Sequence, residues 1–324
     1  MATLNEIKKP VEYEISEFEK YFQSSLESKI PLLKVVLNYI LRRKGKQMRP
    51  LFVLLSAKTL GTITPSSYVA ASLIELLHTS SLIHDDVVDE SYERRGAFSV
   101  NALWKSKISV LVGDFLLAQG LLLSVKNRTY DLLEIVSDAV KEMSEGELLQ
   151  IQKSRKLNIT ESQYYEIIEK KTASLIAACT ACGAKSVTND LEIVDQMKTF
   201  GKLTGIAFQI KDDLLDYEPK GIIGKPTGND IKEKKLTLPL IHALEKTTSS
   251  NKKTILRIIN KPNKNQAKVN EVIEFVKSQN GIAYAVEKMH EYKNQALDIL
   301  SGFDPSSSRQ SLNDLVNFTV ERKK

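Results

Sequence analysis

The feature that most constrains this chain is a helical periodicity that runs through nearly the whole sequence. Apolar residues recur three and four positions apart, and no segment shows the sustained apolar–polar alternation of a half-buried strand. The clearest helical segments are residues 14–28, 31–45, 67–86 and 191–216. We therefore predict an all-α fold, a bundle of a dozen or so helices that forms one domain over residues 1–324.

Several helix ends can be predicted from local residue types, because proline suits the first turn of a helix and glycine suits its end. Pro31 and the pair Thr64-Pro65 are predicted to begin helices, and Gly61 to end one. Residues 305–308 separate the last two helices. The longest predicted loop, residues 218–235, holds three glycines and two prolines, and loops of that length are usually functional or disordered.

Composition excludes some classes of partner and location. The chain is 42% hydrophobic and 27% charged, close to an average globular protein, with a formal charge of +6. The surplus lysines are not interleaved with aromatic residues, so we expect no nucleic-acid partner. No charged-then-apolar leader is visible at the start, which favours a cytoplasmic protein.

The most apolar window, residues 109–125, is interrupted by Asp114 and Gln119. We predict a buried helix there and no transmembrane segment. The two cysteines, Cys179 and Cys182, lie in an alanine-rich helical pattern without a second Cys/His pair. Buried thiols are therefore expected rather than a zinc site.

Two clusters of aspartates share the pattern DDxxD, and each follows a strongly apolar helical segment. The first comprises Asp85, Asp86 and Asp89, and the second comprises Asp212, Asp213 and Asp216. In a helix, residues four apart lie on one face about 6 Å apart along the axis. Like charges this close need a neutralising partner. Carboxylates without cysteine or histidine partners select Mg²⁺, or Mn²⁺, and Mg²⁺ favours sites shared with substrate phosphates.

Basic residues near these clusters fit a phosphate-rich ligand, because arginine binds phosphate oxygens as a fork and lysine as a point charge. They are Lys46, Arg49, Arg94, Arg95, Lys171, Lys225 and Lys235. Two histidines, His78 and His84, lie on the helix of the first cluster. On its own pattern, His84 is interpreted as a packing residue.

Five motifs, in order and spacing, resemble those of the trans-isoprenyl diphosphate synthases. They are "GKQMRP", "LIHDDVVDESYERRG", "EKKTASL", "FQIKDDLLD" and "GKPTGNDIKEKKLTLP", which together span residues 46–239. The resemblance implies an all-α fold around a deep central cavity, a homodimer and a requirement for Mg²⁺. It also implies the head-to-tail condensation of isopentenyl diphosphate with an allylic diphosphate, through an allylic carbocation.

The resemblance also implies roles for single residues. Asp85, Asp89 and Asp212 would be metal ligands, with Asp86, Asp213 and Asp216 as water-mediated or supporting partners. The isopentenyl diphosphate pocket would comprise Lys46, Arg49, His78 and Arg95. The allylic diphosphate would be held by Arg94, Lys171 and Lys235, with Lys225 in a closing loop and Thr172 and Gln209 beside the allylic carbons. One departure is Lys234, where relatives often carry glycine. Either Lys234 or Lys235 is therefore a candidate to face the bound diphosphate.

Product length is predicted from residues one turn before the first cluster. Short-chain members of the family often carry a bulky aromatic residue there, whereas this chain has Ser80 and Ser81. Leu77 and Ile74 lie further down the same helix. They are candidates for the floor of the cavity, at which growth of a longer product would stop. We therefore expect a hexaprenyl to octaprenyl product, which is handed to a membrane, with a geranylgeranyl or farnesyl product as the alternative.

Two other classes of function remain open at this stage. A class I terpene cyclase would also use DDxxD and Mg²⁺, but its second motif is normally an Asn/Ser/Glu pattern. A non-catalytic regulatory subunit would bind an active synthase, and such subunits tend to lose aspartates or basic ligands. Neither loss is visible in this sequence.

Overall fold

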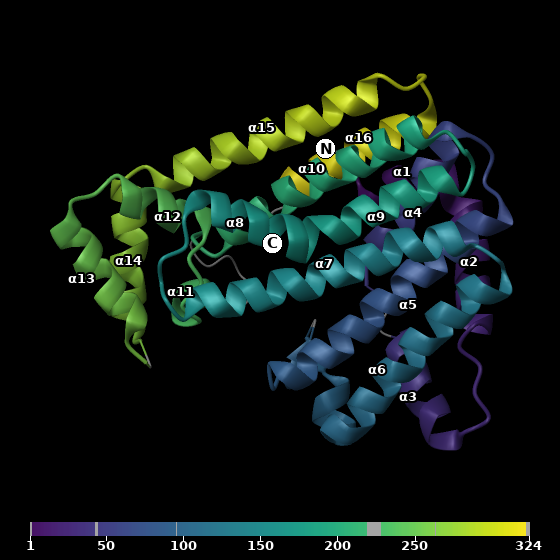
Figure 1. Ribbon diagram of the computed structural model, residues 1–324, viewed down its shortest axis with the longest axis horizontal. Helices are drawn as coiled ribbons and strands as arrows, with labels where there is room; N and C mark the ends of the chain where they lie inside the picture. The colour runs from purple at the N-terminus through teal and green to yellow at the C-terminus, as the bar shows by residue number, and fades with distance from the viewer. Residues whose placement is uncertain (1, 43–44, 95, 219–227, 263, 322–324) are drawn as a thin grey trace.

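The computed structural model describes residues 2–42, 45–94, 96–218, 228–262 and 264–321, and most of them are helical (Figure 1). The α-helices are α1 Leu4–Lys8, α2 Glu12–Ser24, α3 Pro31–Arg42, α4 Met48–Leu60, α5 Pro65–Val88, α6 Val100–Lys126, α7 Tyr130–Ser154, α8 Glu161–Ile168, α9 Ser174–Lys185, α10 Leu191–Leu215, α11 Asn229–Lys232, α12 Leu238–Glu245, α13 Ser249–Asn260, α14 Gln266–Ser278, α15 Gly281–Ser301 and α16 Ser307–Glu321. A 3₁₀ turn covers Lys9–Val11 and a π-helical turn covers Glu169–Ala173. The predicted all-α class is confirmed.

Helix α10 is the central element of the bundle, and it packs against α9 and α15 (Figure 1). Its first half contributes Phe200 to a core shared with α4, α5, α9 and α16. Its second half contributes Ile210 to a core shared with α8 and α12–α15. A third cluster lies between α3, α5 and α6. Cys179 and Cys182 are buried free thiols on α9, as predicted.

The predicted helix boundaries follow local chemistry closely. Helix α5 begins with a capping box between Thr64 and Ser67, and Pro65 occupies its first turn. Gly61 is the C-cap of α4, and Pro31 begins α3. These positions are confirmed because the signals for a helix end lie within a few residues of that end.

Helix α6 differs from its prediction, because it is buried only in part. Its most apolar window is 33% buried, and the helix is long and apolar enough, by length and composition, to cross a membrane. Exposed apolar side chains follow one another along it, namely Leu103, Val110, Leu111, Leu121, Leu122 and Val125. The expectation of a buried helix is therefore wrong for this face, which no element of the described chain covers.

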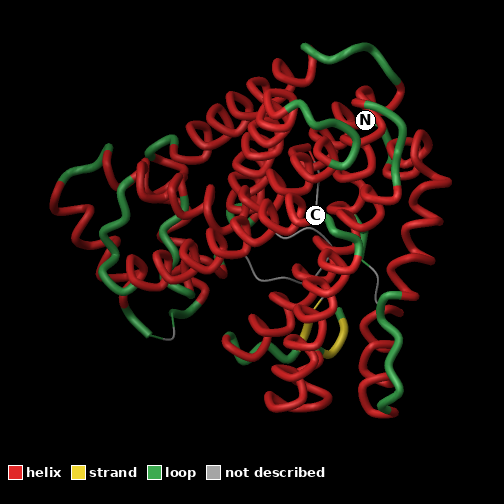
Figure 2. Tube along the Cα trace, turned by 45° about the vertical axis from the view of Figure 1, so that its right-hand side comes forward, coloured by secondary structure: helices red, strands yellow, loops and turns green. Residues whose placement is uncertain are grey.

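A short antiparallel hairpin, β1 Glu93–Arg94 and β2 Ala97–Phe98, interrupts the helical fold between α5 and α6 (Figure 2). Two-residue strands carry no periodicity, so no pattern in the sequence indicates them. Tyr39 of α3 donates a hydrogen bond to the carbonyl of Phe98 over 2.6 Å. The hairpin is thereby attached to the helix beside it.

Candidate active site

Each aspartate cluster lies at the C-terminal end of a long helix. Asp85 and Asp86 occupy the last turn of α5, and Asp89 is its C-cap rather than a helical residue. Asp212 and Asp213 occupy the last turn of α10, and Asp216 is again the C-cap. The C-terminal end of a helix carries partial negative charge, so carboxylates there are disfavoured unless cations come close.

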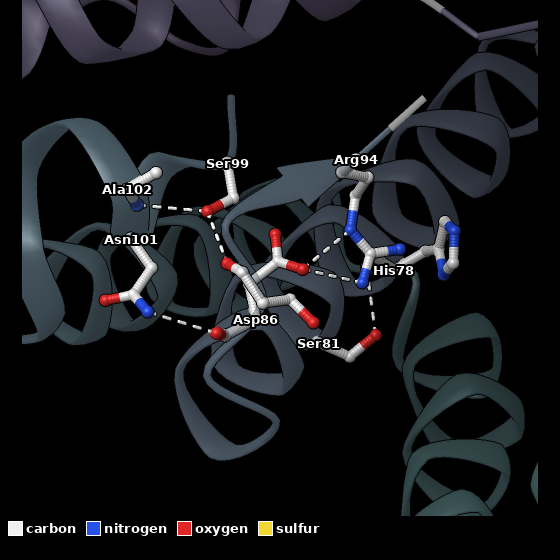
Figure 3. A network of polar contacts seen from close by, with 8 residues as sticks. His78, Ser81, Asp86, Arg94, Ser99, Asn101 and Ala102 are labelled. Carbon is white, nitrogen blue, oxygen red and sulfur yellow. Dashed lines mark hydrogen bonds and ion pairs between the residues drawn. The ribbon is translucent and has the colours of Figure 1, made fainter. Parts of the chain in front are cut away.

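In the first cluster, Asp86 is ion-paired and nearly inaccessible, with 3% of its surface exposed. Its Oδ1 accepts a hydrogen bond from Nε of Arg94 over 2.8 Å and forms an ion pair with Nη2 over 2.8 Å. The Asn101 side chain donates to the carbonyl of Asp86. Figure 3 shows the Arg94 guanidinium reaching Asp86 from the hairpin, with His78 on its other side. The hairpin therefore supplies a fixed cation to this cluster.

In the second cluster, Asp213 is buried among neutral hydrogen-bond donors. Tyr164 donates to its Oδ2 over 2.7 Å, and the Gln209 amide donates to its Oδ1 over 2.8 Å. Burial, followed by the nearby charge of Asp230, raises the pKa of Asp213 to about 7. This carboxyl therefore lies near other acidic groups, and in the part of the chain that the structure describes its hydrogen-bond partners are neutral.

Asp216 has a structural position in this arrangement. Its Oδ1 accepts hydrogen bonds from the backbone N–H groups of Gly228 and Asn229, and its Oδ2 from that of Asp230. These are the first backbone donors of the short helix α11, so Asp216 fixes the start of that helix. Asp230 is thereby held beside the second cluster.

The other three aspartates, Asp85, Asp89 and Asp212, have exposed side chains. Desolvation, followed by the charges of Glu147 and Asp89, raises the pKa of Asp85. Within the described ranges, no three His, Cys, Asp or Glu side chains gather tightly enough to hold one ion by themselves. Exposed carboxylates at negative helix ends suit a hard divalent cation that takes its remaining ligands from water and phosphate. The residues therefore fit Mg²⁺, and their roles as ligands stay a prediction.

Lys171 lies on the π-helical turn, between the two clusters. Its Nζ donates to Gln150 of α7 over 2.6 Å and forms an ion pair with Glu147. Glu147 also acts electrostatically on Asp85 and on Lys235, so it lies near both side chains. The sequence did not identify Glu147 or Gln150, because nothing in the pattern of α7 shows that this face meets Lys171.

The π-helical turn approaches its neighbours closely, and glycines make this possible. A Cβ at Gly146 would lie 2.7 Å from the backbone nitrogen of Lys171. A Cβ at Gly205 would lie 2.5 Å from the Cα of Ala173. Single π turns are rare and occur often at functional sites. The local widening places Lys171 and Thr172 toward one cavity.

That cavity has a volume of about 100 Å³ and is lined by Lys171, Thr172, Gln209, Asp213, Asp230 and Lys235, together with Tyr164 and apolar residues. It brings together all three residues predicted as catalytic. Asp230 was not identified from the sequence, and burial raises its pKa to about 6. Burial acts to lower the pKa of Lys235, but the hydrogen bond that its ammonium donates to Glu233, with the acidic charges nearby, outweighs burial and raises that pKa.

The structure separates the two adjacent lysines of the last motif. Lys234 donates to the side chain of Asn260 over 3.1 Å, whereas Lys235 lines the cavity. Lys235 is thus the one that faces the clusters. Lys225 lies outside the described residues.

A second cavity, of about 310 Å³, lies between α3, α5 and the hairpin. Asp86, Arg94 and His78 line it, together with Gly45 and Gln47. The predicted isopentenyl diphosphate residues are only partly gathered here. The Lys46 ammonium lies 5.4 Å from the centre of the Phe318 ring. Arg49 is half-buried at the start of α4, and Arg95 lies outside the described residues.

The predicted chain-length residues differ in what surrounds them. Ser80 is buried and donates to the carbonyl of Gly113 on α6 over 2.8 Å. Ser81 is half-buried and donates to the carbonyl of His78 in its own helix. Leu77 packs on α6, and Ile74 is fully buried. Ser81 is therefore the less constrained of the two serines. On the same helix, the ring of His84 packs over Gly113, consistent with a packing residue.

Comparison with known proteins shows the family of this chain. The model of the family "Polyprenyl synthetase" matches residues 30–276. The all-trans-nonaprenyl-diphosphate synthase (geranyl-diphosphate specific) of Rhodobacter capsulatus is 35% identical, over 98% of this chain and 97% of its own length. The polyprenyl synthase of Caulobacter crescentus, solved with calcium and isoprenyl diphosphate, has a TM-score of 0.90 at 30% identity, covering 99% and 98% of the two chains.

The geranylgeranyl pyrophosphate synthase of Bacteroides thetaiotaomicron is a further similar structure, with a TM-score of 0.83 and 37% identity over 98% of each chain. Similarity therefore extends over the full length of the chain, in sequence and in fold. The motif resemblance is confirmed, and the chain belongs to the polyprenyl synthetase family of prenyltransferases.

Proposed function

We propose that this chain is a Mg²⁺-dependent synthase that extends an allylic diphosphate with isopentenyl diphosphate. The observation that carries the proposal is the pairing of two aspartate clusters, at the ends of α5 and α10, across the Lys171–Glu147 pair. Asp85, Asp89 and Asp212 are the residues that would hold the cations. The chemistry supplied by bound Mg²⁺ is charge neutralisation on the diphosphate, which makes it a leaving group.

Protein cations complete the diphosphate site. Arg94, Lys171 and Lys235 bind the allylic diphosphate oxygens, and Arg94 can do so while its guanidinium keeps Asp86 neutralised. The bond between C1 and the diphosphate oxygen breaks, and the electron pair leaves with the diphosphate. The double bond of isopentenyl diphosphate then attacks C1, and a proton leaves C2 of that substrate. The departing diphosphate is the base, so no protein general base is required.

The oxygen atoms of Thr172 and Gln209 lie where positive charge develops. Both residues line the cavity beside Lys171, and the Thr172 hydroxyl donates to the Gln209 Oε1 over 2.8 Å. Fixed dipoles that point their negative ends at a developing cation lower its energy in a site with little water. Lys171 and Lys235, which line the same cavity, act on the diphosphate and not on the carbon chain.

We propose a medium-to-long all-trans product, of hexaprenyl to octaprenyl length. The small Ser81, half-buried one turn before Asp85, leaves room for a growing chain. The nonaprenyl-diphosphate synthase of Rhodobacter capsulatus is similar over nearly the whole chain and supports a long product, whereas the similar structure from Bacteroides thetaiotaomicron is a geranylgeranyl pyrophosphate synthase, so the product assay decides between the two lengths.

We also propose that the exposed apolar face of α6 is the interface of a homodimer. Leu111 is 60% exposed and Leu122 47% exposed, and both belong to a row of apolar residues along the helix. Exposed apolar side chains that gather along one helix are typical of an interaction site. Light scattering of the purified protein tests this: a dimer that Leu111→Glu converts to monomer supports it. Vesicle binding by a monomeric wild-type protein would instead assign the face to a membrane.

We place the protein in the cytoplasm as one domain, consistent with the buried free thiols and with a central α10 that joins two cores. The product, once long, is handed to a membrane. No nucleic-acid partner enters this proposal.

The direct test is incubation of the purified protein with farnesyl diphosphate, labelled isopentenyl diphosphate and Mg²⁺. We expect labelled products longer than geranylgeranyl diphosphate on reverse-phase chromatography, and none in EDTA. A hydrocarbon formed from geranylgeranyl diphosphate alone would indicate a terpene cyclase. No release of diphosphate with both substrates would indicate a regulatory subunit.

A further inference from the structure

Four side chains form one unbroken chain of hydrogen bonds from the core to the reaction cavity. Tyr164 on α8 donates to Asp213, the Gln209 amide also donates to Asp213, and Thr172 donates to the Gln209 Oε1. The three bonds measure 2.7, 2.8 and 2.8 Å. Tyr164 lies outside every motif that identified the family, 49 positions before Asp213.

The chemistry of these groups fixes the direction of the chain. Tyr164 and the Gln209 nitrogen both donate to Asp213, so the nitrogen of the Gln209 amide faces Asp213. The Gln209 Oε1 therefore faces Thr172 and the cavity. Because the Thr172 hydroxyl donates its proton to that Oε1, its own lone pairs are also left for the cavity. Two oxygen dipoles consequently present their negative ends to the reaction site.

Tyr164 is well suited to fix the far end of this chain. It is 4% exposed, and burial raises the pKa of its hydroxyl well above the ordinary value, so the phenol stays protonated and donates. Helix α8 itself is held by a capping box between Thr160 and Gln163. Tyr284 of α15 donates to Glu161 of α8 over 2.6 Å.

The geometry points to Tyr164 as a positioning residue that orients the Gln209 amide through Asp213, so that oxygen rather than nitrogen faces the allylic carbon. Without the phenol, the Asp213 carboxyl loses one of its two side-chain donors. The carboxylate can then rotate away from Gln209, which leaves the amide without a fixed acceptor and allows it to reverse and point its N–H groups at the cation. Tyr164 thus assists formation of the allylic carbocation and does not affect substrate binding. This inference rests on the proposed function.

The neighbouring tyrosine is a matched control. Tyr165 lies on the same helix, its ring centre is 5.5 Å from that of Tyr164, and its buried hydroxyl has no hydrogen-bond partner among the described residues. Tyr164→Phe and Tyr165→Phe therefore remove the same atom from adjacent positions, and only the first breaks the chain.

We expect Tyr164→Phe to lower kcat roughly tenfold or more while KM for the allylic diphosphate changes little. Tyr165→Phe should keep wild-type kcat. Affinity for an allylic thiolodiphosphate, which binds without ionising readily, should be the same in all three proteins. A merely structural role would lower affinity and stability together. Equal kcat in Tyr164→Phe and Tyr165→Phe, with wild-type enzyme active, would overturn the inference while leaving the proposed function intact.

A second variant tests the same point if Tyr164→Phe does not fold. Asp213→Asn keeps the side-chain shape, but Tyr164 then donates to the amide oxygen at position 213 and directs the NH₂ group there toward Gln209. Gln209 must turn its Oε1 to that group, so kcat should fall roughly tenfold or more. In that background Tyr164→Phe frees the amide at position 213 to turn, and should restore part of kcat. Additive losses in the double variant would contradict the positioning role.

Discussion

The two aspartate clusters have the same pattern but opposite electrostatic settings. In the first, the buried Asp86 accepts a hydrogen bond from the guanidinium of Arg94 and is ion-paired with it. In the second, the buried Asp213 accepts from the neutral Tyr164 and Gln209, and its pKa rises to about 7. The buried aspartate of one cluster has a cationic partner, whereas that of the other accepts from neutral donors alone among the described residues.

This difference shows that a DDxxD pattern predicts carboxylates but not their counter-charges. The counter-charge of Asp86 comes from a hairpin that follows α5, and the donors of Asp213 come from α8 and α10. We infer that the two clusters have different roles. The α5 cluster holds diphosphate through Arg94, whereas a bound cation stabilises the carboxylates of the α10 cluster more strongly.

The largest expected effect is the loss of an exposed aspartate from either cluster. Asp85→Asn and Asp212→Asn each remove a charge that would hold a cation, so we expect turnover to fall at least about a hundredfold. Diphosphate release at saturating substrate measures this. Glu90→Gln, an exposed acid beside the first cluster, is the matched control and should stay near wild type. A loss below about tenfold for Asp85→Asn would contradict its assignment as a ligand.

The next prediction compares the loss of Arg94, the charged partner of Asp86, with the loss of Tyr164, a neutral partner of Asp213. Arg94→Gln leaves the buried Asp86 without a cation, and we expect it to lower the free energy of unfolding by about 1–3 kcal/mol, less than for a fully buried pair because Arg94 is partly exposed. Tyr164→Phe should cost less, about 1 kcal/mol. Urea unfolding measures both. Asp86→Asn should recover part of the loss in Arg94→Gln, and an additive double variant would show that the pair does not act as a unit.

Stability of the metal-free protein should depend on pH because of Asp213 and Asp230. In the unfolded chain both carboxyls lose their protons near pH 4, whereas the folded chain keeps them until about 7 and 6. Between these values the folded state binds more protons. The free energy of unfolding therefore falls as pH rises from about 4 to 7 and then levels.

The melting temperature in EDTA between pH 5 and 8 measures this dependence. Asp213→Asn should flatten it, because the variant lacks the group with the higher pKa. Asp86→Asn is the comparison from the other cluster, and the same flattening in both variants would argue against the electrostatic difference between the clusters.

The smallest effect on rate, with the clearest effect on product, is expected at Ser81. Ser81→Phe fills space before Asp85 and should shorten the product to about geranylgeranyl or farnesyl length, with the first condensation unchanged. Ser80→Ala, which removes a hydroxyl bonded to α6, should keep product length. Chromatography of the dephosphorylated products decides this, and unchanged length in Ser81→Phe would remove Ser81 from the set of chain-length residues.

The sequence predicted those parts of the fold that depend on nearby residues. The capping box at Thr64 and the helix start at Pro31 are local signals, and both are confirmed. The prediction for the exposed face of α6 was wrong, because an apolar helix has the same pattern whether a core, a second copy or a membrane covers it.

Site residues that belong to sequence motifs could be predicted, whereas residues that reach the site only through tertiary contacts could not. The sequence pointed to Lys171, Thr172, Gln209 and Asp213, which meet at one cavity. Glu147 and Tyr164 could not be found this way, because their partners lie more than 20 positions away on other elements. Asp230 lies inside a recognised motif but was not identified, because residues 218–235 were predicted as a loop, whereas Asp230 lies in the short helix α11.

The central claim is that the two unlike clusters form one site that binds diphosphate only with divalent cations. Calorimetric titration of the wild-type protein with an allylic thiolodiphosphate, in Mg²⁺ and in EDTA, tests it most directly. The account predicts tight binding in Mg²⁺ and at least about a hundredfold weaker binding in EDTA. Equal affinity in both would contradict it, since the arginine and lysines alone would then suffice.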